Sequence, residues 1–388
     1  MTDRSLSTSR SAGWTAAEYF AGIGLAREGL EKGGVKVVWS NDISPVKQRL
    51  FSHFFGDGTA HRYLVGDLGE LKPEDLPDPV DVAWASFPCT DLSVAGTRAG
   101  LHKGPASSTF WHFIKVLSKL GSDRPTIVAL ENVSAFATSH SGRDIASAIQ
   151  SLNGLGYSVD VLNVDARHFV PQSRPRLFLV GVRADVHTSD DAHEARPGWL
   201  QAIFQDPTLR THKFALPSLP APLTDGLDSY VEQIDESDGR WWDEVRVDAY
   251  IASLSALQHA RLEELRSRHS VTHRTAYRRM RLGIPRWEMR ADGISGCLRT
   301  ARGGSSKQAV VQAGNGQMRV RWMTPIEYAR LMGMQRLRVD GLLDRHVYSA
   351  FGDAVCAPVV EWLTTHYFVP VLQQATAVRS GQRAVSGN

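Results

Sequence analysis

Cysteine and long apolar runs are the two features this sequence has least of. Only Cys89, Cys297 and Cys356 occur among 388 residues, and no two form a C-x-x-C pair. This set supports neither a disulfide framework nor a cysteine zinc site, and a reducing compartment is the default. No apolar run reaches the roughly 18 to 20 residues of a membrane helix, and Met1–Ser11 is polar rather than signal-like. We therefore expect a cytoplasmic protein without a membrane span.

Metal-ligand patterns are also missing. His269 and His273 have helical ligand spacing, but no further ligand pattern accompanies them. We interpret the pair as part of a solvated helix face and predict no metal.

Charge is balanced over the whole chain but not along it. The formal net charge is only +3, yet fourteen cationic side chains oppose four carboxylates between Arg261 and Arg321. A segment of this kind gains affinity for a polyanion because contacts with phosphates release counterions. We expect it to meet such a partner; an arginine-rich solvated surface is the alternative.

Short β-rich runs alternate with helical periods from Trp14 to Val182, which is typical of a largely parallel sheet with helices on both faces. Helices are predicted at Leu25–Lys32, from Ser44-Pro45 onward, and at Phe110–Leu120. Strands are predicted at Thr15–Tyr19, Val35–Ser40, Val80–Ser86, Thr126–Leu130, Tyr157–Asn163 and Leu177–Val182. An α/β domain of residues 14–183 follows.

The alternation stops after Arg183. Proline, aspartate and tryptophan become frequent, with one helical stretch near 247–269, and we predict a smaller irregular domain over residues 184–320. Helical patterns return after Thr324-Pro325 and from Phe351-Gly352 to Leu372. Residues 321–388 are expected to return to the first domain.

A glycine turn follows the first strand. Gly22 and Gly24 let backbone amides approach a ligand, which is typical of nucleotide binding, but the third glycine of the dinucleotide fingerprint is absent. A nicotinamide oxidoreductase is therefore disfavoured. Asp42 closes the second strand, where a carboxylate can accept hydrogen bonds from ribose hydroxyls, and Asp67 closes a further strand.

Cys89 stands directly after Pro88 at a strand end, a position that suits a nucleophile. A free cysteine alone is more commonly a small buried apolar residue. The surrounding motifs change this interpretation, because eight of them occur in the order of the DNA (cytosine-5) methyltransferase family, which most of this chain resembles. They are F-A-G-I-G at 20–24, N-D at 41–42, G-D-L at 66–68, F-P-C-T-D-L-S at 87–93, E-N-V at 131–133, Q-S-R-P-R at 172–176, E-Y-A-R-L-M-G at 327–333 and F-G-D-A-V at 351–355.

The resemblance implies a Rossmann-like sheet and a transfer of a methyl group from S-adenosylmethionine to carbon 5 of cytosine. Carbon 5 is a poor nucleophile until a group adds to carbon 6, and Cys89 would make that addition as a thiolate. Glu131 would protonate or hydrogen-bond the ring nitrogen opposite. Arg174 would reach the base carbonyl, while Arg176 would stabilise the site.

The resemblance further implies which residues hold the methyl donor. Phe20 would lie against the adenine, Asp42 on the ribose and Asp67 on the adenine amino group, with Gly22 and Gly24 beside the amino-acid end. Further expected contacts are Ile43, Leu68, Pro88, Asp353 and Val355. Departures from the family pattern include Glu18, Leu25, Thr90, Ser107–Thr109 and Asp353, of which none removes a reacting group.

Double-stranded DNA is the implied partner, with the target cytosine rotated out of the helix. The glycine-rich segment Ser93–Ser108 would close over it. Residues expected to contact DNA are Ser93, Arg98, Arg299, Arg302 and Lys307. We expect a monomer, and a cognate restriction or defence system is a further candidate partner. An RNA cytosine methyltransferase and a catalytically silent DNA-binding relative remain the alternatives.

Overall fold

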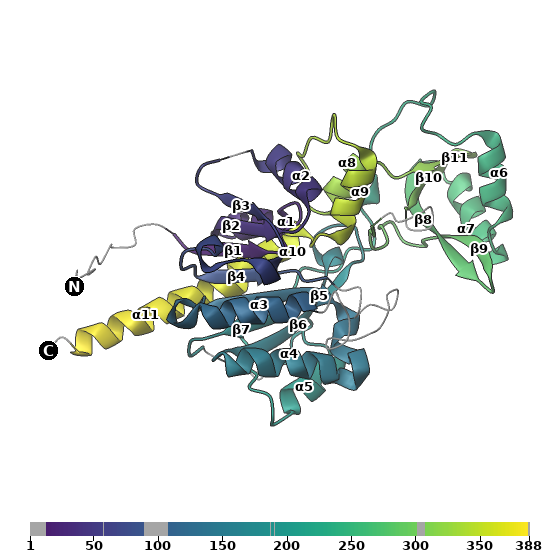
Figure 1. Cartoon of the computed structure of the whole chain (residues 1–388). Helices are drawn as coiled ribbons and strands as arrows, with labels where there is room; N and C mark the ends of the chain where they lie inside the picture. The colour runs from purple at the N-terminus through teal and green to yellow at the C-terminus, as the bar shows by residue number, and fades with distance from the viewer. Residues whose placement is uncertain are drawn as a thin grey trace.

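The computed structural model describes residues 13–56, 58–88, 108–186, 188–189, 191–300 and 307–386, which contain two sheets (Figure 1). The larger sheet has seven strands in the order β3-β2-β1-β4-β5-β7-β6. Neighbours from β3 to β5 are parallel, whereas β7 runs antiparallel to β5 and β6. The strands are β1 (Thr15–Tyr19), β2 (Lys36–Asp42), β3 (Arg62–Val65), β4 (Val82–Ala85), β5 (Ile127–Val133), β6 (Ser158–Asp165) and β7 (Pro175–Val182).

The predicted α/β fold is confirmed, and the predicted strands end within three residues of the observed ones. α1 (Leu25–Lys32) matches the prediction and is followed by Gly33 and Gly34. α2 (Pro45–Phe55) begins as the sequence indicates, since the Ser44 hydroxyl accepts a hydrogen bond from the Lys47 amide at 3.3 Å. The remaining helices of this part are α3 (Ser108–Lys119) and α4 (Arg143–Gly154).

Helices cover both faces of the large sheet. Successive strand residues point to opposite faces, so Val82 belongs to the buried cluster under α1 and Ala83 to the cluster under α3 and α4. The first cluster also includes residues of α8 (Pro325–Leu331), α9 (Asp344–Asp353), α10 (Ala357–Leu363) and α11 (Val369–Ser386). These C-terminal helices thus share one buried cluster with α1.

The predicted final helix is divided. Pro358 lies in the first turn of α10, and a π-helical turn at Thr364–Phe368 precedes α11. The stretch Asp344–Val378 is long and apolar enough to cross a membrane by composition alone, but 67% of its most apolar window is buried in the protein. Its apolar residues serve the core.

The smaller sheet is antiparallel, with the order β11-β10-β8-β9, and is more regular than the irregular domain expected there. Trp287, Val311 and Val320 pack against Tyr250 and Leu262 of two covering helices. The elements are α6 (Glu244–Ala252), α7 (Ala256–Ser267), β8 (Thr272–Arg281), β9 (Ile284–Met289), β10 (Ala309–Gly314) and β11 (Gln317–Trp322).

Two expectations about this region differ from the structure. His269 and His273 do not share a helix face, because the chain is extended in β8 from Thr272 and the His273 ring is bound to Asp228 at 2.8 Å. The buried apolar residues between Ala195 and Val231, a range that includes α5 (Gln201–Gln205), belong to the clusters on the large sheet, while Asp228 also contacts β8. Arg196 there forms a buried ion pair with Asp160 of β6.

Candidate functional site

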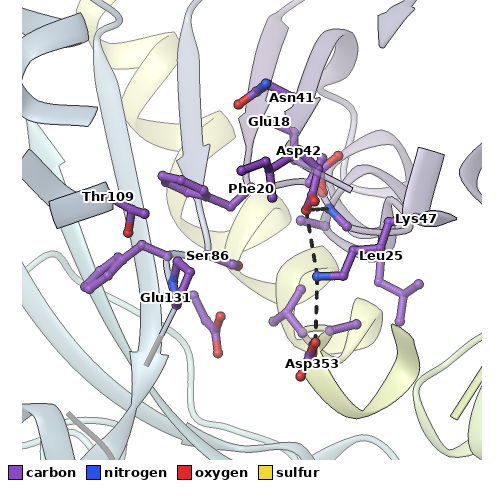
Figure 2. Close-up of a pocket in the computed structure, with 18 of the residues that line it drawn as sticks. Glu18, Phe20, Leu25, Asn41, Asp42, Lys47, Ser86, Thr109, Glu131 and Asp353 are labelled. Atoms are coloured by element: carbon purple, nitrogen blue, oxygen red, sulfur yellow. Dashed lines mark hydrogen bonds and ion pairs between the residues drawn. The ribbon is translucent and has the colours of Figure 1, made fainter. Parts of the chain in front are cut away.

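A cavity of about 370 Å³ opens at the carboxyl ends of the parallel strands (Figure 2). This edge of an open α/β sheet is the usual place for a ligand. Most of the motifs described above converge on it, although they are far apart in the sequence. The lining residues include Glu18, Phe20, Gly22, Asp42, Ile43, Asp67, Leu68, Pro88, Thr109, Glu131, Arg176, Asp353 and Val355.

The glycine turn between β1 and α1 has a left-handed backbone: φ is 56° at Phe20, 59° at Gly22 and 81° at Gly24. Gly24 does not line the cavity. A Cβ there would lie 2.6 Å from the Phe51 ring, so this position needs glycine for packing rather than for ligand contact. The Gly22 amide donates to the Asp42 carboxylate at 2.9 Å, which ties the turn to the end of β2.

Glu18 is a buried carboxyl in the wall of the cavity. Burial raises its pKa to about 8, and the Ser40 hydroxyl donates to it at 3.3 Å. The carboxyl is therefore largely neutral at pH 7. A neutral Glu18 carboxyl can be buried beneath the glycine turn, whereas an ionised carboxylate there would require a counter-ion.

Lys47 bridges two carboxylates across the cavity, as Figure 2 shows. Its ammonium lies 3.8 Å from Asp42 and 3.7 Å from Asp353. Asp353 also accepts a hydrogen bond from Thr300. The positive charge of the Lys47 ammonium thus compensates the negative charge of the Asp353 carboxylate. Sequence reasoning missed Lys47, since a single lysine in the first turn of a helix carries no distinctive pattern.

Glu131 and Arg176 face each other at the end of the cavity, with 3.2 Å between carboxylate and guanidinium. Strand pairing explains the meeting: Glu131 is opposite Phe178, and Arg176 stands two residues before Phe178 on the same face. The Asn132 amide donates to the Phe87 carbonyl at 3.1 Å. This bond ties the end of β5 to the segment that leads through Pro88 to Cys89.

Arg174 does not line this cavity, which corrects the expectation that it reaches the base. Its guanidinium is 1% exposed and donates to the carbonyls of Leu298, Gly352 and Ala354 at 2.8, 3.0 and 2.5 Å. Arg174 lies just before β7, which begins at Pro175, so contacts with distant segments rather than the strand decide where its side chain points, and sequence spacing alone did not reveal them. Arg174 holds three distant segments together.

Replacing Arg174 by methionine is expected to lower the free energy of unfolding by about 3 kcal/mol or more, because several buried carbonyls lose their donor. Arg176→Met, whose side chain is at the cavity, is expected to cost about 1 kcal/mol or less. Urea titration of both variants measures the difference. Equal midpoints for the two variants would contradict the structural role of Arg174.

Several expected residues fall outside the described part of the chain, namely Cys89, Ser93, Arg98 and Arg302. Arg299 is exposed in the segment that connects β9 to β10. Lys307 is half-buried, with its ammonium 4.0 Å from the centre of the Tyr348 ring and 5.7 Å from that of Trp322. Burial lowers the pKa of Lys307, and these ring contacts leave it poorly placed for a phosphate.

No group of three or more histidine, cysteine, aspartate or glutamate side chains that could hold a metal ion occurs within the ranges given for the structure. The cavity instead offers a glycine turn, carboxylates and one guanidinium. These groups suit an organic ligand.

Comparison with known proteins adds three findings. Residues 14–368 match the family model described as "C-5 cytosine-specific DNA methylase". The chain is 29% identical over 174 residues to type II methyltransferase M.Bsp6I of Bacillus sp. (strain RFL6), covering 44% of this chain and 53% of that protein. It is 32% identical over 171 residues to type II methyltransferase M.HaeII of Haemophilus aegyptius, covering 44% and 51%. The chain thus spans about half the length of these curated relatives.

Solved structures show the same fold. The Entamoeba histolytica methyltransferase EhMeth superposes with a TM-score of 0.58 and 14% identity, covering 93% of this chain and 99% of that one. The S. pombe Dnmt2 methyltransferase superposes with a TM-score of 0.57 and 15% identity, covering 91% of this chain and 97% of that one.

Proposed function

Because the chain belongs to the C-5 cytosine-specific DNA methylase family, we propose that it transfers a methyl group from S-adenosylmethionine to carbon 5 of cytosine in double-stranded DNA. One observation carries this proposal: the Glu131–Arg176 pair lies at the end of a ligand-sized cavity that Pro88 also lines. Pro88 is the residue directly before Cys89. A proton donor and a cation thus lie in the same cavity as the residue that precedes the proposed nucleophile in the sequence.

The pair complements the edge of a cytosine. That edge presents a carbonyl oxygen and a ring nitrogen as acceptors and an amino group as donor. A protonated Glu131 donates to the ring nitrogen and accepts from the amino group, while Arg176 donates to the carbonyl oxygen. We therefore assign the carbonyl contact to Arg176 in place of Arg174.

Cys89 starts the reaction by adding its thiolate to carbon 6, which moves the ring electrons to carbon 5 and the nitrogen. Glu131 stabilises that electron density by donating its proton at the nitrogen. Carbon 5 then takes the methyl group from S-adenosylmethionine, which leaves as S-adenosylhomocysteine. A base removes the carbon 5 proton, and the electrons of that C–H bond re-form the double bond between carbons 5 and 6. Cys89 leaves as a thiolate with the electrons of the carbon–sulfur bond, and the proton on the ring nitrogen returns to Glu131.

S-adenosylmethionine supplies an electrophilic methyl group, and the cavity residues fit it. A volume of about 370 Å³ lies within the range of small-molecule sites. Phe20 offers a ring for the adenine, and Asp42 and Asp67 offer acceptors for hydroxyl and amino groups. Lys47 of α2, Asp353 of α9 and Val355, which follows α9, form part of the cavity wall.

Transfer of a labelled methyl group tests the proposal directly. Duplex DNA containing all short sequence contexts is incubated with the protein and labelled S-adenosylmethionine, and single-stranded RNA of the same base composition is run beside it. We expect 5-methylcytosine in the DNA. Label in the RNA alone would favour the RNA methyltransferase, and binding without transfer would favour a silent relative.

We also propose that the protein acts as a monomer in the cytoplasm, because a single extruded base needs one pocket. The type II relatives support pairing with a restriction or defence system. Light scattering in solution and methylation mapping in expressing cells test these points.

A further inference from the structure

The β8–β9 hairpin of the smaller sheet has an unusual tip. Leu282 and Gly283 connect the two strands, with φ values of 51° and 79°. Two positive φ angles are normal for a tight hairpin turn, but asparagine, aspartate or glycine usually occupies the first position. A leucine there is strained, and strain of this kind is commonly kept for a function.

The tip is also apolar and solvent-exposed. Leu282 is fully exposed, at 102%, while Met280 and Ile284 are 64% and 54% exposed. None of the three belongs to the buried cluster beneath α6 and α7. The fold of the smaller unit therefore gives no reason for these side chains.

Arginines surround this apolar tip. Arg279 and Arg286 are directly opposite each other in the strand register, where like charges repel. Arg281 is opposite Ile284 on the same face, and Glu288 is the one carboxylate paired with Arg279 or Arg281 in the described part of the chain. The cationic excess at the hairpin is thus only partly neutralised.

Other arginines of the basic segment are paired with carboxylates. These ion pairs are Arg266–Glu263, Arg268–Glu264, Arg290–Asp292, Arg319–Glu236 and Arg321–Glu327. Lys307 is engaged with aromatic rings. The hairpin, which Figure 1 shows at the outer edge of the smaller unit, instead has three arginines, Arg279, Arg281 and Arg286, beside the single carboxylate of Glu288.

We propose that the β8–β9 hairpin is a DNA-contacting finger: Arg279, Arg281 and Arg286 neutralise phosphates, and Leu282 enters a groove between them. This inference rests on the proposed function, because it takes duplex DNA as the substrate. A polyanion relieves the repulsion between Arg279 and Arg286. Apolar tips flanked by arginines suit a groove, where leucine packs against sugars and base edges.

The first test measures binding of a labelled random-sequence duplex over a range of salt concentrations. Each phosphate contact contributes about 0.9 to the slope of log affinity against log salt. We expect the triple variant Arg279→Gln/Arg281→Gln/Arg286→Gln to lose about two to three from that slope. The matched control Arg261→Gln/Arg266→Gln/Arg268→Gln removes the same charge from α7 and from the residue directly after it, and its slope should fall by about one or less.

The second test uses Leu282→Asn, which installs the residue preferred at this turn position. Its thermal unfolding midpoint should stay the same or rise, since the turn is less strained. Its affinity for the duplex should fall several-fold. A loss of both stability and affinity would indicate a merely structural leucine and overturn the tip's role.

The outcomes separate this inference from the proposed function. If the unaltered protein binds no duplex DNA, both fail. If it binds and methylates DNA, but the hairpin and α7 variants have equal slopes, the finger alone is refuted. Vesicles of phosphatidylserine serve as a competing surface, and hairpin-dependent binding to them without a change in DNA binding also overturns it.

Discussion

Replacing Cys89 by alanine is expected to lower methyl transfer by roughly four to six orders of magnitude, as removal of a catalytic nucleophile does. Without sulfur at carbon 6, carbon 5 has no electron pair to offer the methyl group. Binding of DNA and of S-adenosylmethionine should persist within a few-fold. Single-turnover transfer with equilibrium binding on the same preparation measures both quantities.

Cys356→Ala is the matched control for this prediction. The Cys356 thiol is buried at the start of α10, and burial raises its pKa to about 12, so it remains protonated at neutral pH. Its removal should change transfer by less than about ten-fold through packing alone. Comparable losses for the two variants would argue against Cys89 as the nucleophile.

Glu131→Gln is expected to lower the rate of transfer by about two to four orders of magnitude, the usual contribution of a positioned proton donor. Glutamine keeps the size of the side chain but cannot deliver a proton to the ring nitrogen. Single-turnover kinetics at saturating DNA give the rate. DNA affinity should change little, because the loss falls on the chemical step.

Arg176→Met supplies the second half of this test. If Arg176 positions Glu131 and contacts the carbonyl of the base, the two substitutions will not act independently. The transfer rate of the double variant Glu131→Gln/Arg176→Met will then fall by less than the product of the two single fold-losses. Independent, multiplicative losses would show that the 3.2 Å ion pair does not act as one unit. A methyl-transfer rate in Glu131→Gln equal to that of the unaltered protein would show that Glu131 is not the proton donor.

The large sheet could be predicted because its signals are local. The alternation of apolar runs marked the strands, Gly33-Gly34 marked the end of α1, and Ser44-Pro45 marked the start of α2. The gathering of Glu131, Asp42 and Pro88 also followed from their positions at the ends of parallel strands.

The features that could not be predicted from the sequence depend on contacts between distant segments. Arg174 and Arg176 look alike in sequence. The structure separates them, because Arg174 binds the carbonyl groups of Leu298, Gly352 and Ala354, whereas Arg176 binds Glu131 at the cavity. Lys47 gains its importance from Asp353, three hundred residues later. His273 lies in a strand because β10 pairs with it, a tertiary effect that helical spacing cannot reveal.

Cys297 is a second cysteine whose surroundings in the structure would suit a nucleophile. Burial raises the pKa of its thiol, but the guanidinium groups of Arg174 and Arg176 outweigh burial and lower it overall. Its sulfur lies 3.9 Å from Arg176, which also contacts Glu131. A nucleophilic role for Cys297 is therefore a concrete alternative that an experiment can decide.

Trapping the covalent intermediate tests the central claim most directly. Random-sequence duplexes in which every cytosine is 5-fluorocytosine are incubated with the protein and S-adenosylmethionine, since fluorine at carbon 5 blocks the final elimination. Mass spectrometry of the digested complex then locates the modified residue. We predict a stable complex attached through Cys89 and absent in Cys89→Ala; attachment through Cys297, or no covalent complex while methylation of ordinary DNA proceeds, would contradict the account.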